Sequence, residues 1–313
     1  MRLFLIAVLL SLSACVLAQE AKQGRTVNIE LKSAADVALK KAEVLEKTAQ
    51  AYTNAGNHAA ALPLRRSALD ILEGAFGRSH PNVADALINL ALTHSALGQY
   101  DLTLLLQIRA LAITEKVAGP KHEDTALALV MLGRTYQQLA RYEEALPLQI
   151  RALAIAEKRL GAERLETSAA IVMLARNYFA LDLYEKALPL QIRALGIAEK
   201  AFGTEHPNAV PALGDLANTY SALAQYNMAL PLKLRALKIA EKSFGAEHVI
   251  TAIQLHSLAL FYSLLAQHEK AFLLQERVLR ILEKIYGPQH SDTTSALNNL
   301  ALTYLALGRV AIA

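Results

Sequence analysis

The sequence predicts an all-α solenoid of six helix pairs and one final helix, and three observations lead to this fold class. A sixteen-residue phrase, LPLQIRALAIAEKRLG, occupies residues 146–161 and recurs with small changes from Leu188 and Leu230. The glycines that end this phrase and its looser copies stand 42 residues apart, without insertion or deletion: Gly77, Gly119, Gly161, Gly203, Gly245 and Gly287. Ala and Leu dominate a 313-residue chain that is 54% hydrophobic and has no tryptophan. That composition favours helices, and the fixed period indicates one unit stacked along a single axis.

The charges argue against several classes of function. The chain has 32 basic and 28 acidic residues, which give a formal charge of +4, and the two signs are interleaved. No block of basic residues is present such as nucleic-acid binding requires, so we predict no nucleic-acid partner. The one cysteine, Cys15, lies near the N-terminus. A mature chain without it can form neither an internal disulfide nor a thiolate nucleophile.

Residues 1–18 are predicted to be an export signal. Arg2 supplies a positive charge, and the apolar run Leu3–Leu12 is too short to span a bilayer comfortably. Two processing routes fit this segment. The sequence LSAC resembles the bacterial lipobox, in which the cysteine (here Cys15) is lipidated, whereas VLA suits ordinary signal peptidase with cleavage before Gln19. We expect an exported protein, either periplasmic or secreted or lipid-anchored to the membrane, with a tether at residues 19–33.

The first helix of each unit is best read in Thr125–Leu139, where apolar residues recur at helical spacing. Gly133 stands where the partner helix must approach closely. The same slot is filled in the other units by Ala49, Ala91, Ala175, Ala217, Ala259 and Ala301. Because only small residues occur there, we interpret this slot as a packing requirement.

The second helix of each unit follows a tight turn that ends in an aromatic residue or histidine. These residues are His58, Tyr100, Tyr142, Tyr184, Tyr226 and His268. Four units carry an early proline, which we interpret as a helix start signal with a slight kink: Pro63, Pro147, Pro189 and Pro231. Lysines in the last turn suit the negative end of the helix, and we expect the glycine that follows to adopt the left-handed cap conformation.

Together these features resemble the tetratricopeptide repeat, which has a small residue and Tyr in its first helix, Tyr at the turn and Ala in its second helix. The 42-residue period and the corner GTEHP at residues 203–207 resemble the longer kinesin-light-chain variant. The resemblance implies a right-handed α-α superhelix over residues 34–313. Its repeats fall at about 34–77, 78–119, 120–161, 162–203, 204–245 and 246–287, with a partial repeat at 288–313. The sequence departs from the pattern at Ser67, Arg164-Leu165 and Val310.

The sequence ends at Ala313, where a partner for the helix at Ser291–Gly308 is expected to begin. That helix would expose an apolar flank, with Leu297, Leu300, Leu305 and Leu307. Two interpretations follow: a shortened gene product, or a surface for self-association through this C-terminal helix.

Two series of polar residues repeat with the units. Corner histidines (His80, His122, His206, His248 and His290) are one repeat apart, about 10 Å, which is too far for shared zinc ligands. We therefore predict no metal site and expect these histidines to cap or pack the corner. Arginines recur at Arg109, Arg151, Arg193, Arg235 and Arg277. Because they barely vary, we expect them to tie neighbouring repeats together and not to line a charged stripe for a partner.

The positions that vary between units are better candidates for binding. In tetratricopeptide repeats the first helix lines the concave groove. That register implies the groove residues Asn89, Leu92, Arg134, Gln137, Arg176, Phe179, Asn218, Ser221, His256, Leu260 and Asn298. We expect Arg134 and Arg176, with nearby amides and an aromatic, to hold an extended peptide through carboxylate hydrogen bonds and one apolar pocket, which favours an acidic partner.

The sequence thus predicts a protein–protein interaction scaffold that is not an enzyme, because no phosphate loop, GxSxG, HExxH or CxxC motif is present. We expect no cofactor and no membrane contact beyond the alternative lipid anchor. Two other functions remain open. One is the sensor half of a shortened relative of bacterial proteins in which such repeats precede a caspase-like protease, and the other is a self-associating structural solenoid.

Overall fold

A computed structural model describes residues 34–308, and this part of the chain consists of helices joined by short turns, without a strand. The all-α prediction is confirmed. A first helix covers residues 34–54. It is followed by α2 (His58–Phe76), α3 (Pro81–Ala96), α4 (Tyr100–Val117), α5 (Glu123–Gln138), α6 (Tyr142–Arg159), α7 (Leu165–Ala180), α8 (Tyr184–Phe202), η1 (Pro207–Ala209), α9 (Val210–Ala222), α10 (Tyr226–Phe244), α11 (Val249–Leu264), α12 (His268–Tyr286) and α13 (Ser291–Ala306). The predicted signal, Cys15, the tether and Val310 lie outside the described residues.

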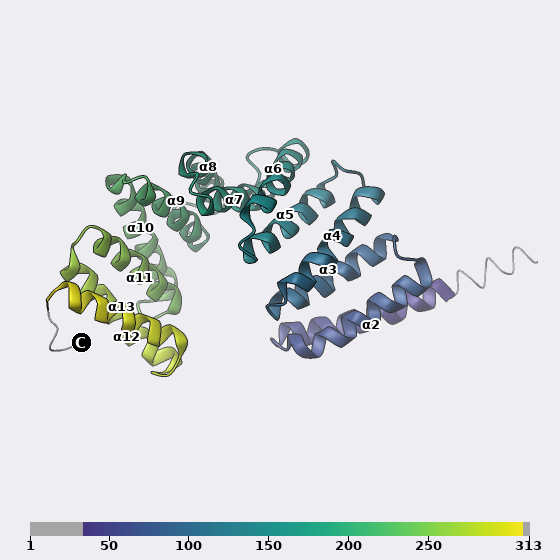
Figure 1. Cartoon of the computed structure of the whole chain (residues 1–313), viewed down its shortest axis with the longest axis horizontal. Coiled ribbons are helices and arrows are strands. Elements are labelled where there is room, and N and C mark those ends of the chain that lie inside the picture. The colour runs from purple at the N-terminus through teal and green to yellow at the C-terminus, as the bar shows by residue number, and fades with distance from the viewer. Residues whose placement is uncertain (1–33, 309–313) are drawn as a thin grey trace, which may run out of the picture. The chain divides into compact units, whose positions relative to one another are not determined.

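The chain divides into two compact units, which we describe separately. Unit 1 ends at Leu139 and unit 2 begins at Ala140. Within each unit, helices that are consecutive in the chain lie side by side (Figure 1). We call the helix at residues 34–54 and the odd-numbered helices α3–α13 the A helices, and the even-numbered helices α2–α12 the B helices. The B helices start 42 residues apart, from His58 to His268.

A histidine caps the N-terminus of most A helices. In the five corners that carry it, Nδ1 accepts the backbone N–H of the residue two positions later at 3.1–3.3 Å. Four of these rings also stack on the aromatic residue that ends the preceding B helix, with centroids 4.4–5.2 Å apart. The predicted capping role is confirmed. Arg164, which replaces histidine in one corner, makes no side-chain cap.

Two local predictions about the B helices are wrong. The prolines are interior: Pro63 stands five residues after the helix start at His58, and Pro147 equally far after Tyr142. The turn residue, and not proline, therefore starts the helix. The glycine at the C-cap does have positive φ, but Gly203 has φ 97° and ψ 155°, and Gly77, Gly245 and Gly287 are similar. A positive φ combined with such a large ψ is a conformation that glycine alone adopts readily, and it differs from the left-handed helical cap.

The repeated arginines tie neighbouring repeats together as predicted. Arg193 forms an ion pair with Glu157, 36 residues earlier on the previous B helix, at 2.5 Å, and also donates to the carbonyl of Ala162. Arg235 and Arg277 form the same ion pair, with Glu199 and Glu241 respectively, and each also donates to a corner carbonyl. Arg109 makes the same two kinds of contact in unit 1. The strict repetition of these arginines thus has a structural cause.

Candidate functional site

A buried polar side chain recurs at the same position of every B helix, in unit 1 and in unit 2. We call this set, without implying one continuous surface, the inner polar row: Arg65, Gln107, Gln149, Gln191, Lys233 and Gln275. Each of the six is no more than 6% exposed. Burial of a polar group is costly without a hydrogen-bond partner, so the contacts of this row decide what it can do.

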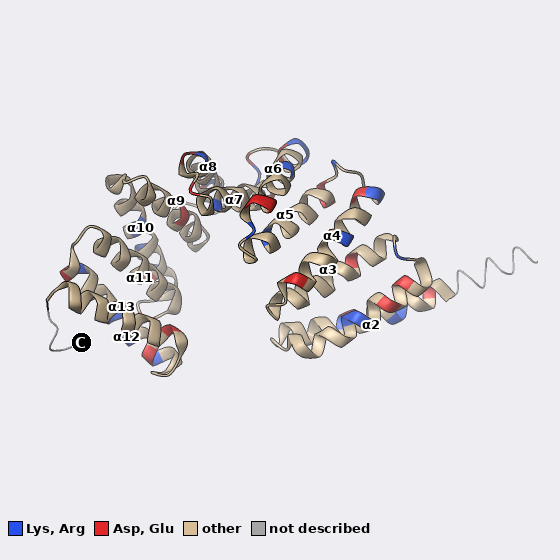
Figure 2. Ribbon diagram, in the orientation of Figure 1, with Lys and Arg blue, Asp and Glu red and all other residues tan. Residues whose placement is uncertain are grey.

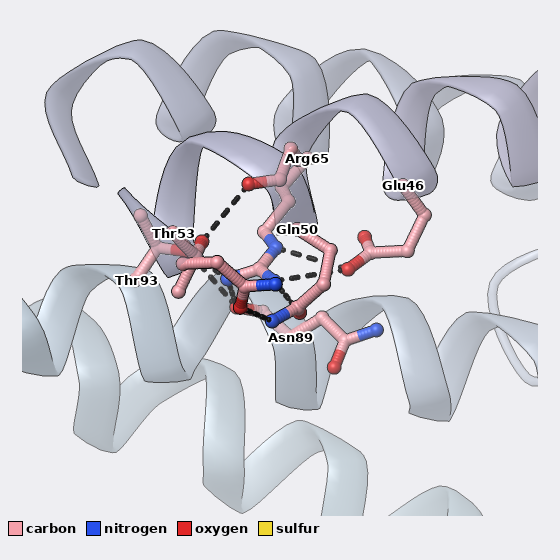
Figure 3. A network of polar contacts seen from close by, with 8 residues as sticks. Glu46, Gln50, Thr53, Arg65, Asn89 and Thr93 are labelled. Atoms are coloured by element: carbon pink, nitrogen blue, oxygen red, sulfur yellow. Dashed lines mark hydrogen bonds and ion pairs between the residues drawn. The ribbon is translucent and has the colours of Figure 1, made fainter. Parts of the chain in front are cut away.

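Arg65 shows where the row points. Its guanidinium pairs with Glu46 at 3.0 Å and donates to Gln50 Oε1, both on the preceding A helix, and to Thr93 Oγ1 and the carbonyl of Asn89 on α3 (Figure 3). The side chain therefore inserts between two successive A helices. Its charge is neutralised there by the carboxylate of Glu46.

Lys233 takes the same place in unit 2 with different partners. Its Nζ donates to Asn218 Oδ1 on α9 at 2.8 Å and to Ser257 Oγ on α11 at 2.9 Å, and lies 5.8 Å from the centroid of the Phe261 ring. Burial lowers the pKa of Lys233 to about 8. The ammonium group is thus held by neutral oxygens where Arg65 has a carboxylate.

The glutamines of the inner polar row are less well satisfied. The Oε1 atoms of Gln107, Gln149, Gln191 and Gln275 have no hydrogen-bond partner in residues 34–308. Buried acceptors of this kind are rare in folded proteins and call for a donor from elsewhere. The sequence analysis singled out only the arginines two positions later. The 42-residue recurrence of these polar residues on an otherwise apolar helix face was the available signal.

Unit 2 contains a hollow between α11, α12 and α13, which we call the C-terminal hollow. Its volume is about 300 Å³. Aliphatic side chains make up much of its wall, and polar groups complete it: Val249, Ala252, Ile253, His256, Val278, Leu282, Asp292, Ser295, Ala296 and Asn299. His256 is half-buried, and this burial lowers its pKa. A hollow with an apolar lining and a few polar groups suits an apolar side chain of a ligand.

Unit 1 has a smaller hollow, of about 180 Å³, with a different chemistry. Glu43, Glu46 and Asp85 lie in its wall. Burial, and secondarily the charge of Asp124, raises the pKa of Asp85. Glu46 is paired with Arg65, but Glu43 and Asp85 would repel an acidic ligand, so the predicted preference for an acidic partner finds no support in this hollow.

The structure gives several of the predicted groove residues intramolecular contacts. Arg176 Nε donates to Asp215 Oδ2 at 2.8 Å, so its charge is already compensated, and Phe179 packs edge-on against Tyr184. Ser221 donates to its own helix. Arg134 lies on α5 of unit 1 and is exposed, whereas Arg176 belongs to unit 2.

The remaining groove residues differ in exposure. His256 lines the C-terminal hollow, and Asn218 contacts Lys233. Leu92 and Leu260 are each 47% exposed. Asn298 is also exposed, whereas Asn89 and Gln137 are half-buried.

Charged residues of both signs are scattered along the helices of each unit (Figure 2). Within residues 34–308, no group of three or more His, Cys, Asp or Glu side chains is placed to hold a metal ion. None of the helices in the same range is long and apolar enough to cross a membrane.

The chain belongs to the tetratricopeptide repeat family. The family model matches residues 41–107, 104–158, 166–242, 212–284 and 250–313. Repeats of this family generally bind protein partners, which supports an interaction scaffold in general terms. No curated protein matches the chain.

Several solved structures are similar. One is a Podosopora anserina protein whose structure is described as that of kinesin light chain nearly identical TPR-like repeats. Its sequence is 26% identical, and the TM-score is 0.57 over 64% of this chain and 96% of that one. BtubC (BKLC) from P. vanneervenii is 18% identical, with a TM-score of 0.57 over 69% of this chain and 92% of that one. The apo form of RapI is 16% identical, with a TM-score of 0.62 over 87% and 99% of the two chains. The last two show a shared fold only.

Proposed function

We propose that this protein is a scaffold that binds a partner protein or peptide on the A-helix face of unit 2. The observation that carries the proposal is the C-terminal hollow, an apolar recess with polar groups at α11 and α13. Family membership makes a protein partner the expected class of ligand. An extended peptide lying across the A helices would insert one apolar side chain here and make polar contacts with His256 and Asn299.

We also propose that the protein is exported to the periplasm or beyond, with lipid attachment at Cys15 as the alternative. This proposal rests on the sequence alone, because the residues concerned lie outside 34–308. The regulatory half of a caspase-like protease also remains an untested alternative. Self-association has one observation in its favour: α13 exposes Leu297, Leu302 and Leu305 by 50–64%. Leu300, predicted to lie on that flank, is instead buried. Sedimentation of the full chain tests this alternative, since a monomer at all concentrations would exclude it.

The proposal is tested by changing the wall of the C-terminal hollow without disturbing the fold. Ile253 is 56% exposed and lines the hollow, whereas Leu273 on α12 is 64% exposed and does not. Ile253→Glu places a charge in the recess, and Leu273→Glu is the matched control with the same change of chemistry elsewhere. We expect a pull-down from periplasmic and membrane extract to lose at least 90% of the specific partner with Ile253→Glu only. Equal capture by both variants and the wild type would exclude this face.

A further inference from the structure

The exposed faces of α6 and α8 repeat one pattern of five residues. The ion pair between Arg193 and Glu157 joins these two helices, so the two patterns are neighbours within unit 2. In each helix the five positions are spaced by four, three, four and four residues, which places them on one side of the helix. We call the resulting surface the B face of unit 2. Its residues are all exposed: Glu143, Pro147, Ile150, Ala154 and Lys158 on α6, and Glu185, Pro189, Ile192, Gly196 and Lys200 on α8.

The centre of the B face is apolar and is not used by packing within the chain. Ile150 and Ile192 are 46% and 48% exposed. One exposed isoleucine is ordinary, but here it recurs on neighbouring helices, each time followed by a small residue. Gly196 is a second, independent observation. A glycine inside a helix costs about 1 kcal/mol relative to alanine, and a Cβ added to Gly196 would meet nothing within 4 Å. The fold of the chain does not require this glycine, whereas close approach of another helix would.

The two ends of the B face carry opposite charges. Glu143 and Glu185 stand in the first turns of their helices, and Lys158 and Lys200 in the last turns. None of the four forms an ion pair with another residue in the range 34–308. In both helices the isoleucine lies almost midway between the glutamate and the lysine. A half-turn about an axis that crosses both helices at their isoleucines therefore exchanges the acidic and basic ends.

We propose that the B face of unit 2 binds the same face of a second copy of this chain, with the helices antiparallel across a two-fold axis. In this pairing α6 lies against α6 of the second copy, and α8 lies against α8. Each isoleucine packs beside its counterpart near the axis. Glu143 meets the second copy's Lys158, and Glu185 meets the second copy's Lys200.

Symmetry and charge select this occupant and this orientation. A two-fold interface requires a surface that is complementary to itself, and the B face meets this condition in its apolar centre and in its charged ends. The parallel pairing of the two faces would bring glutamates against glutamates and lysines against lysines, which is unfavourable.

The size of the B face sets the expected affinity. The 18 residues of α6 are about 27 Å long, and two helices about 10 Å apart provide on the order of 500 Å² from each copy. Two copies together reach the roughly 1,000 Å² of a small specific interface, so we expect a dimer with a micromolar dissociation constant.

The pairing goes beyond the proposed function and adds to what the scaffold can do. The C-terminal hollow is lined by residues of α11, α12 and α13, and none of them belongs to α6 or α8. A dimer through the B face therefore carries two such hollows. A partner with two recognised segments would bind it more tightly than it binds one copy, because the second binding event is intramolecular.

The first test is sedimentation of the full chain over a range of concentrations. Combining Ile150→Glu with Ile192→Glu places carboxylates at the axis and should raise the dissociation constant of the dimer at least tenfold. Ile253→Glu is the matched control, because it makes the same change at a residue of α11 that is 56% exposed. The control should keep the dimer and lose partner capture, and the double variant should do the reverse. Failure of the inference is thus distinct from failure of the proposed function.

An exchange of charges tests the antiparallel orientation. Glu143→Lys with Glu185→Lys leaves only lysines at the ends of the B face, and Lys158→Glu with Lys200→Glu leaves only glutamates. Each variant alone brings like charges together and should dimerise at least tenfold more weakly than the wild type. An equimolar mixture of the two should form a heterodimer about as tight as the wild-type dimer, since every contact then joins opposite charges.

Three results would overturn the inference: a wild type that is monomeric at every concentration, a dimer that survives the isoleucine changes, or a charge mixture that does not recover. Loss of the dimer with Leu297→Glu on α13, but not with the isoleucine changes, would assign self-association to the C-terminal helix instead. A monomeric wild type that binds phosphatidylglycerol vesicles, and loses this binding with the isoleucine changes, would assign the B face to a lipid surface.

Discussion

At the scale of single residues, one position on the B helix shows how a repeated fold acquires individual sites. Gln at this position is buried and uncharged, Arg65 brings its own counter-charge in Glu46, and Lys233 relies on the amide and hydroxyl of Asn218 and Ser257. The backbone is the same in each case, so the difference lies in side-chain chemistry alone. Variation within a strict repeat therefore marks Lys233 more clearly than exposure does.

The buried lysine makes stability depend on pH in a defined window. Burial lowers the pKa of Lys233 from 10.5 to about 8, so between these values the unfolded chain binds the proton and the folded chain does not. Stability attributable to this residue therefore rises as pH increases from about 8 to 10.5, and the penalty is fully present below pH 8. The shift corresponds to roughly 3 kcal/mol at most.

The measurement is urea unfolding of wild type and Lys233→Gln at several pH values. The variant should be more stable near neutral pH, and its advantage should shrink by a few kcal/mol between pH 8 and 10.5. Taking the difference between the two proteins cancels the titration of other groups. A constant difference across this range would mean that the lysine is well solvated in the folded protein.

At the scale of helices, the turn between an A helix and its B helix holds one residue at positive φ. Glycine occupies this place at Gly56 and Gly98, but Asp182, Ala224 and Ala266 have φ of 54–58°. A side chain in this conformation costs about 1–2 kcal/mol relative to glycine. The later turns therefore carry local strain that the packing of the repeats tolerates.

Relief of this strain is a direct test of the turn geometry. Ala224→Gly and Ala266→Gly should each raise the free energy of unfolding by about 0.5–1 kcal/mol, the gain being reduced by the greater entropy of glycine in the unfolded chain. Ala169→Gly, at an exposed position inside α7, is the control and should lower it by a similar amount. Thermal unfolding of the three variants measures the difference. A loss of stability in all three would show that the turns are unstrained.

Helices and corners could be predicted from the sequence because their causes are local. The corner histidine, the turn aromatic and the 42-residue period each act within one repeat or between adjacent copies. Pro147 misled because proline is favoured in the first turn of a helix, whereas here it stands in the second turn, where it removes a backbone hydrogen bond. The pairing of Arg176 with Asp215 could not be predicted, since it depends on how two A helices align across 39 residues.

At the scale of the whole molecule, the repeats have one invariant side and one variable side. The arginine ties join successive B helices by the same two contacts, an ion pair and a bond to a corner carbonyl. The side chains that vary between repeats lie on the A helices and in the inner polar row. The family and the architecture were therefore predictable, whereas the proposed binding site depends on the few residues that depart from the repeat.

The last prediction concerns cooperativity, which in repeat proteins depends on the coupling between neighbours. Arg193, Arg235 and Arg277 are 23–34% exposed, so replacing each by Gln should cost about 1 kcal/mol. The triple variant should unfold in urea over a broader range, with a smaller apparent m-value, because repeats of unit 2 then unfold more independently. Arg280→Gln, at an exposed position on α12, removes the same charge without a tie and should leave the transition unchanged. A triple variant as stable and as cooperative as the wild type would assign the coupling to the apolar contacts between helices, and the repetition of these arginines would then need another explanation.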